Sequence, residues 1–242
     1  MHNTCHIKWT AIIITFMEIN PLHAWDLSPS QARELQNQLC GSVDRANTKY
    51  KLDKIAGIDV STSSRSATGC AAIVVLSYPS LELIDTAVFE GNISFPYIPG
   101  LLSFREAPLI IQAWNRLKTR PDIVMVDGQG IAHPRRLGIA SHLGLLIDIP
   151  TIGCAKSRLT GNHTILPEKA GSYAYLTDKD EVIGAAVRTK DGVKPLYISI
   201  GHKISLAGAI DIVLKCCRGY RLPEPTRSAH IAAGTMHPYH VI

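Results

Sequence analysis

The segment that most constrains the fold is a short apolar run that ends in a carboxylate and a glycine-rich turn. It spans residues 121–136 and reads PDIVMVDGQGIAHPRR. A continuous apolar run bounded by turn residues is typical of a buried parallel strand. Asp127 is then expected at the carboxyl end of that strand, where open α/β sheets bind their ligands. A carboxylate that faces two cations across a tight turn suits a metal ion and a phosphate, which indicates phosphodiester chemistry.

The size and composition of the chain allow one large domain or two small ones. Its 242 residues are 46% hydrophobic, which is ample for a packed core. The formal net charge of +5 is compatible with a nucleic-acid partner but does not identify one. The apolar run at 11–17 is too short to span a bilayer, so no membrane partner is expected. We expect a cytoplasmic protein with reduced thiols, because its six cysteines show no C-x-x-C spacing.

Apolar patterning predicts a mixed sheet with helices on both faces. Strands are expected at 54–61, 68–76, 81–89, 121–127, 150–154, 181–188 and 196–200. Helices are expected at 31–40, 101–117, 136–147, 203–217 and 226–235. A three-strand antiparallel meander followed by αβαβ is the element order of the ribonuclease H-like fold. That fold takes its catalytic carboxylates from the first and fourth strands.

Asp59 lies among the apolar residues of the first expected strand, Ile55–Val60. A buried, unpaired carboxylate is costly, so Asp59 needs a partner. It could be a hydrogen-bonded residue that caps a turn. The second Asp on a strand of the same sheet favours instead a metal shared by Asp59 and Asp127.

Seven sequence blocks in order resemble those of the endonuclease V family, the deoxyinosine 3′ endonucleases. The resemblance runs from about Trp25 to near the C-terminus. The blocks are AGIDVS at 56–61, PYIPGLLSFRE at 96–106, VDGQG at 126–130, HPRRLGIASH at 133–142, GCAKS at 153–157, GHKIS at 201–205 and YRLPEPTRSAH at 220–230. The resemblance implies a single endonuclease V domain over residues 24–242. Residues 1–23 lie outside the family's usual start and are interpreted as an N-terminal extension.

The resemblance implies a catalytic site of five residues. Asp59 and Asp127 would bind magnesium and Glu106 would complete the acidic cluster, since hard cations take carboxylate oxygens. Manganese is expected to substitute. Lys156 would hold the scissile phosphate or orient the water, and His230 would be metal-associated or transfer a proton. Without the resemblance, Glu106 and Lys156 are interpreted as solvated side chains and His230 as a structural histidine.

The same resemblance predicts how DNA is held. Pro96-Tyr97-Ile98-Pro99 is either a rigid turn or a wedge that enters a base stack, and the family uses it as its strand-separating wedge with Tyr97 at the tip. The pocket for the displaced base would be formed by Gly128, Gly130, Leu137 and Gly138, with main-chain amides reading the base edge. His133, Arg135 and Arg136 would contact backbone phosphates. Arg65 and Arg105 are assigned equally to assisting them or to surface charge.

The function predicted from the sequence is therefore a magnesium-dependent DNA repair endonuclease. It would recognise deoxyinosine or other deaminated bases and hydrolyse the second phosphodiester bond 3′ to the lesion, leaving 3′-hydroxyl and 5′-phosphate ends. One alternative is cleavage of inosine-containing RNA, and another is a non-catalytic module that binds damaged DNA. A small-molecule phosphohydrolase on the same fold does not explain the Pro-Tyr-Ile-Pro motif. We expect a monomer because no exposed apolar stripe stands out.

Overall fold

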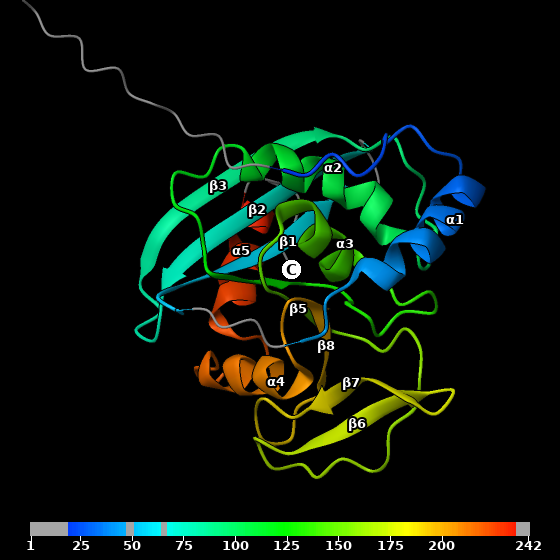
Figure 1. The fold of residues 1–242 in the computed structure, drawn as a ribbon. Helices are drawn as coiled ribbons and strands as arrows, with labels where there is room; N and C mark the ends of the chain where they lie inside the picture. Colours follow the sequence, from blue (N-terminus) through cyan, green and yellow to red (C-terminus); the bar gives the residue numbers. More distant parts are fainter. Residues whose placement is uncertain (1–18, 47–50, 64–66, 236–242) are drawn as a thin grey trace, which may run out of the picture.

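Residues 19–46, 51–63 and 67–235 are described by a computed structural model (Figure 1). Over these residues the sheet has eight strands in the order β3-β2-β1-β4-β5-β8-β7-β6. The strands are β1 Lys54–Thr62, β2 Thr68–Ser77, β3 Leu83–Asn92, β4 Ile123–Val126, β5 Thr151–Ala155, β6 Tyr173–Asp178, β7 Glu181–Val187 and β8 Leu196–His202. The helices are α1 Pro29–Leu39, the short 3-10 helix Cys40–Ser42, α2 Leu102–Trp114, α3 Ile139–Ile147, α4 Leu206–Lys215 and α5 Glu224–Thr235.

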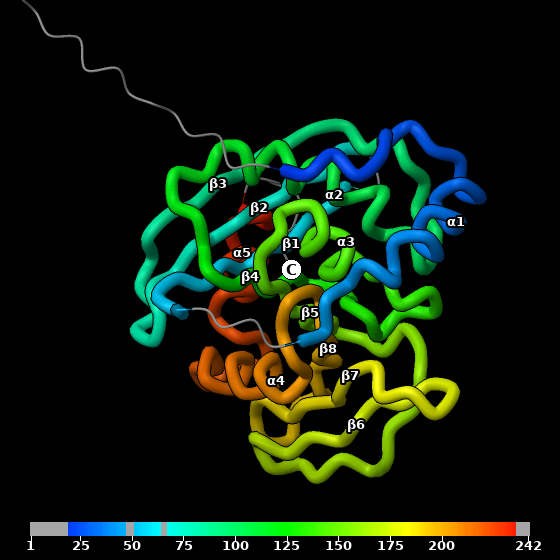
Figure 2. Tube along the Cα trace, in the orientation of Figure 1, coloured from blue at the N-terminus to red at the C-terminus, as the bar shows by residue number. Residues whose placement is uncertain are grey.

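The predicted mixed α/β fold is confirmed. The strands β1 to β3 form an antiparallel meander, and β4 and β5 continue the sheet parallel to β1. Figure 2 shows β4 in the centre of the molecule, between β1 and β5. The predicted pairing of β7 with β8 is present and antiparallel. The edge strand β6 was not predicted.

Two hydrophobic clusters cover the two faces of the sheet. Helices α2 and α3 pack on one face, whereas α4 and α5 pack on the other (Figure 1). Helix α3 begins at Ile139 and not at residue 136 as predicted, because Arg136 has a φ of 56° and Gly138 is extended. Helix α4 begins after Ser205, whose Oγ accepts a hydrogen bond from Gly208 N at 3.1 Å. Both helices therefore begin three residues later than predicted, at Ile139 and Leu206, after the preceding loop.

Part of the predicted N-terminal extension contacts the domain. The amide of Asn20 donates to Leu146 O at 2.7 Å, which satisfies a carbonyl at the end of α3. The Nε2 atoms of His23 and His142 are 2.7 Å apart. Residues 1–18 of that predicted extension lie outside the described residues, as does Cys5.

The described part of the chain holds five cysteines, all of them free thiols: Cys40, Cys70, Cys154, Cys216 and Cys217. Within the same residues, none of the helices has the length and apolar character needed to cross a membrane.

Candidate active site

Two carboxylates meet because β1 and β4 run parallel. In this pair Ile58 lies beside Val126, so the next residue of each strand comes to the same edge of the sheet. These residues are Asp59 and Asp127, and the amide of Asp127 donates to Ile58 O at 2.9 Å. The strand register, which follows from two short apolar runs, therefore places both carboxylates together.

His230 reaches the same edge from α5. Its Nδ1 lies 2.6 Å from Asp59 Oδ2, and because a carboxylate only accepts, this nitrogen carries the hydrogen. About 55% of the His230 side chain is exposed. The helix can come this close because residue 57 is glycine: a Cβ there would lie 1.8 Å from Pro225 O, at the start of α5. The contact between helix and strand thus sets the position of His230.

The donor set fits a divalent cation. One ligand atom from each of Asp59, Asp127 and His230 can be chosen so that all three lie within 4.8 Å of one another. Glu106 of α2 is buried beside them, and burial, followed by the charges of Asp59 and Asp127, raises its pKa to about 8. The three carboxyl groups repel one another when charged, and a bound cation would reduce this repulsion.

Lys156 lies directly after β5 and forms an ion pair with Asp127 Oδ2. Burial raises the pKa of Asp127 to about 6, and Asp59 adds to this rise while Lys156 opposes it. Lys156 is therefore the cation that partly balances the acidic cluster. Its side chain remains about one third exposed, which leaves it accessible to a ligand.

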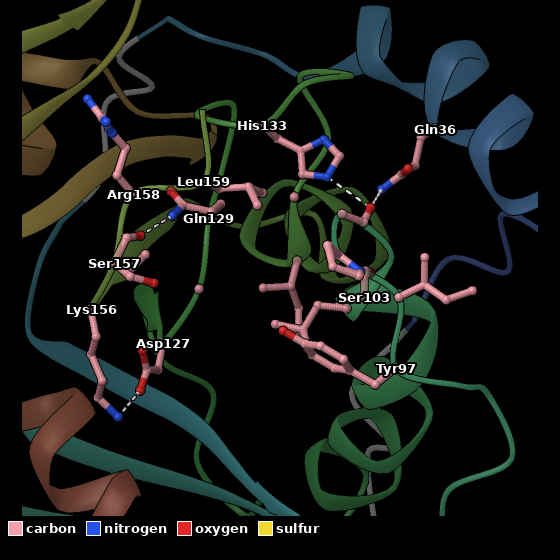
Figure 3. Close-up of a pocket in the computed structure, with 18 residues that line it drawn as sticks. Gln36, Tyr97, Ser103, Asp127, Gln129, His133, Lys156, Ser157, Arg158 and Leu159 are labelled. Atoms are coloured by element: carbon pink, nitrogen blue, oxygen red, sulfur yellow. Dashed lines mark hydrogen bonds and ion pairs between the residues drawn. The ribbon is translucent and has the colours of Figure 1, made fainter. Parts of the chain in front are cut away.

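A cavity of about 250 Å³ extends from the acidic cluster (Figure 3). Asp127 and Lys156 lie at one end, and Tyr97 with Ser103 lies across from them. The Tyr97 side chain is unusually open to solvent for an aromatic residue, at 70% exposure. Of the residues predicted to bind DNA, the lining includes Tyr97, Ile98, Pro99, Gly128, His133 and Gly138.

The main-chain amides of two glycines in the predicted base pocket have partners within the fold. The amide of Gly130 donates to Ser199 Oγ at 2.8 Å, and the amide of Gly138 donates to Gly130 O at 3.0 Å. Both donors are therefore used inside the fold, and reading of a base edge by main-chain amides of this pocket stays a prediction. Neither Gly130 nor Leu137 is among the residues that line the cavity.

Three residues that the sequence predicts to contact phosphate make internal contacts, and their contact with DNA stays a prediction. His133 Nε2 and Arg135 Nη2 each donate to Gly100 O at 2.9 Å. Burial lowers the pKa of His133 to about 4, so this side chain is neutral near pH 7. Arg136 pairs with Asp178 at 2.9 Å and with Glu181 at 2.6 Å. These contacts give all three residues a structural role within the described fold.

Two further arginines, Arg105 and Arg65, were considered as additional phosphate contacts. Arg105 Nη1 donates to Phe95 O at 2.7 Å, which ties α2 to the segment before the Pro-Tyr-Ile-Pro motif. Arg65 lies outside the described residues.

Two glutamines of the cavity wall were assigned no role from the sequence. Gln129 Nε2 donates to Ser157 O at 2.8 Å, and its Oε1 is buried without a partner. Gln36 of α1 is buried and contacts residues far away in the chain. A glutamine in a polar helix gives no local signal of such contacts, although Gln36 follows buried Ala32 by one helical turn.

The comparisons with known proteins agree with this geometry. Residues 34–231 match the family model described as Endonuclease V. The chain belongs to the endonuclease V family. An endonuclease V from Dehalococcoides mccartyi is 51% identical over 220 residues, which cover 91% of this chain and 99% of that protein. One from Gloeobacter violaceus is 53% identical over 212 residues, 86% of each chain.

Solved endonuclease V structures share the fold. The Bacillus subtilis protein superposes with a TM-score of 0.87 at 30% identity, covering 93% of this chain and 98% of that one. The Ciona intestinalis protein, in complex with DNA containing an inosine followed by a ribo-adenosine, gives 0.75 at 30% identity and covers 86% and 96%. Asp59, Asp127 and His230 thus gather at one site within an endonuclease V fold.

Proposed function

We propose that this endonuclease V family member is a DNA repair enzyme that acts at deoxyinosine. It hydrolyses the second phosphodiester bond 3′ to the lesion and leaves 3′-hydroxyl and 5′-phosphate ends. The observation that carries the proposal is the continuity of the acidic cluster with the cavity beside exposed Tyr97. The DNA complex of the Ciona relative supports the choice of substrate.

The metal in this proposal is magnesium, which manganese can replace. Asp59 and Asp127 hold it, with Glu106 completing the acidic set. When bound, the ion supplies Lewis-acid stabilisation of the negative charge that develops on the phosphate.

The side chains of this chain have three further roles. Lys156 beside Asp127 holds a phosphate oxygen, because it is the accessible cation next to the cluster. His230 donates through Nδ1 to Asp59, so its Nε2 is the atom that exchanges a proton with water or with the leaving oxygen. Burial and the charges of Asp59 and Asp127 raise the pKa of Glu106 to about 8, and a cation held beside it would favour its charged form.

Recognition of the lesion uses the opposite wall of the cavity. Tyr97 enters the base stack and separates the strands, and the displaced base occupies the cavity between Tyr97 and Asp127. Displacement costs unstacking energy, which is smallest at a mismatched or damaged base, so a wedge contributes to lesion selectivity.

The test is a cleavage assay on four end-labelled oligonucleotides: inosine DNA, its adenine control and the two RNA equivalents. Each is incubated with magnesium and with a chelator. A magnesium-dependent nick one nucleotide beyond the inosine, in DNA only, is the expected result. A preference for RNA would replace DNA repair by inosine-RNA cleavage. Tight binding without a nick would mean a non-catalytic module.

We also infer a monomeric enzyme of the cytoplasm. The mass measured by light scattering should equal 26.4 kDa, the mass of one chain. A mass of twice that value would contradict the monomer.

A further inference from the structure

A single backbone carbonyl, that of Gly100, accepts hydrogen bonds from three side chains. Gln36 Nε2 donates at 3.0 Å, and His133 Nε2 and Arg135 Nη2 each donate at 2.9 Å. We call these three side chains the Gly100 cradle. Gly100 lies in the turn that Leu101 N closes by donating to Ile98 O at 2.9 Å, and Tyr97 directly precedes this turn. The cradle therefore holds the turn that follows Tyr97.

The hydrogen positions in the cradle are mutually consistent. The amide of Arg135 donates to His133 Nδ1 at 3.1 Å, so the hydrogen of the neutral ring lies on Nε2, the atom that faces Gly100 O. Gly100 has a φ of 80°, and a Cβ there would lie 2.9 Å from Arg135 Nη2. The turn needs glycine both for its backbone angle and for the approach of the cradle.

Gln36 joins the cradle to the rest of the cavity wall. Its side chain is 1% exposed. Nε2 also donates to Leu137 O at 2.9 Å, and Oε1 accepts from Arg135 Nε at 2.6 Å. One side chain of α1 thus bridges the turn after Tyr97 and the loop that leads into α3. A displacement of either partner must stretch one of its hydrogen bonds.

We propose that Gln36 is a positioning residue for strand separation, which fixes Tyr97 relative to the cavity that receives the base. The inference rests on the proposed function, since the placement of Tyr97 matters only if that side chain enters the duplex. The acidic cluster and His230 lie on β1, after β4, on α2 and on α5, outside the cradle. Loss of Gln36 should therefore impair duplex recognition and leave the chemical step largely intact.

The experiment compares two inosine substrates, a duplex and the same strand alone, which needs no separation. Gln36→Met keeps the length of the side chain and removes its hydrogen bonds. We expect it to raise the half-saturating enzyme concentration for the duplex about 10-fold. The value for the single strand and both maximal single-turnover rates should change by less than about 3-fold. Gln38→Met, on the exposed side of the same helix, is the matched control and should behave as wild type.

Gln36→Glu is the second variant. Its carboxylate can still accept from Arg135, but it cannot donate to the two carbonyls, so it should show the same duplex-specific loss. Equal losses on both substrates, unchanged duplex binding, or failure of both variants to fold would overturn the proposal. If the wild-type protein nicks neither substrate, the proposed function itself fails. If the wild type nicks both and Gln36→Met is silent, only the positioning role is lost.

Discussion

Replacing Gly57 by Ala should separate His230 from Asp59. The added Cβ would lie 1.8 Å from Pro225 O and 2.6 Å from Thr226 N, both in the first turn of α5. Real Cβ atoms essentially never come closer than 3.0 Å to such atoms. The helix must therefore retreat by at least 1.2 Å, the difference between 3.0 and 1.8 Å.

That retreat is large compared with the contact it disturbs. His230 Nδ1 and Asp59 Oδ2 are 2.6 Å apart, and adding the full displacement gives about 3.8 Å, which is beyond hydrogen-bond range. A misplacement of about 1 Å in a catalytic group can reduce the rate about 100-fold. Overpacking of this kind also costs about 1–3 kcal/mol of stability.

The assay is single-turnover cleavage of an inosine duplex at saturating enzyme, together with thermal unfolding. Gly57→Ala should lose about 100-fold in rate and melt at a lower temperature. Gly234→Ala is the control, because it lies in the same helix with open space around its Cβ position. Alanine is favoured over glycine in a helix by about 1 kcal/mol, so the control should not be destabilised. A Gly57→Ala protein with wild-type rate and melting temperature would refute the packing argument.

Three further predictions concern the cluster, the wedge and a buried histidine. Asp127→Ala should abolish cleavage and retain lesion binding, because it removes a metal ligand; turnover at the wild-type rate would rule out the metal assignment. Tyr97→Ala should weaken binding of an inosine duplex about 10-fold through loss of base stacking, and a titration showing unchanged affinity would remove the wedge. Burial lowers the pKa of His142 to about 3, so the folded protein keeps this ring neutral while the unfolded chain takes up a proton below about pH 6.5. The free energy of unfolding should therefore fall by about 1.4 kcal/mol from this group between pH 7.5 and pH 5.5; equal urea midpoints at the two pH values would contradict the assignment.

The sequence predicts the centre of the sheet well because burial there leaves a plain signal. The runs that became β1 and β4 are continuous and apolar, and each is followed or interrupted by an Asp that such a run does not otherwise tolerate. The edge strand β6 gives no such signal. Its residues alternate between buried and exposed, but the exposed positions Tyr173 and Tyr175 are aromatic, so the residue types lack the apolar–polar alternation that predicts a strand.

The internal contacts of the site arginines escape prediction for a different reason, which is sequence distance. Arg136 meets Asp178 and Glu181 more than 40 residues later in the chain, and Arg135 meets Gln36 almost 100 residues earlier. Two consecutive arginines after a glycine-rich turn indicate a phosphate site only while their partners are unknown. Pairing that depends on the tertiary fold cannot be read from a local pattern.

The blocks that carry the family resemblance therefore contain buried residues with internal contacts and residues whose side chains are open to solvent. His133 and His230 both belong to such blocks, and both rings have a nitrogen that donates to an oxygen. His133 is almost fully buried and uses both ring nitrogens within the fold, so its proton has no exchange partner. His230 uses Nδ1 on Asp59 and keeps half of its side chain exposed beside the acidic cluster. A histidine needs a ring nitrogen that is free to exchange a proton, so the exposed ring on α5 suits the proposed proton transfer and the buried ring before α3 suits a structural role.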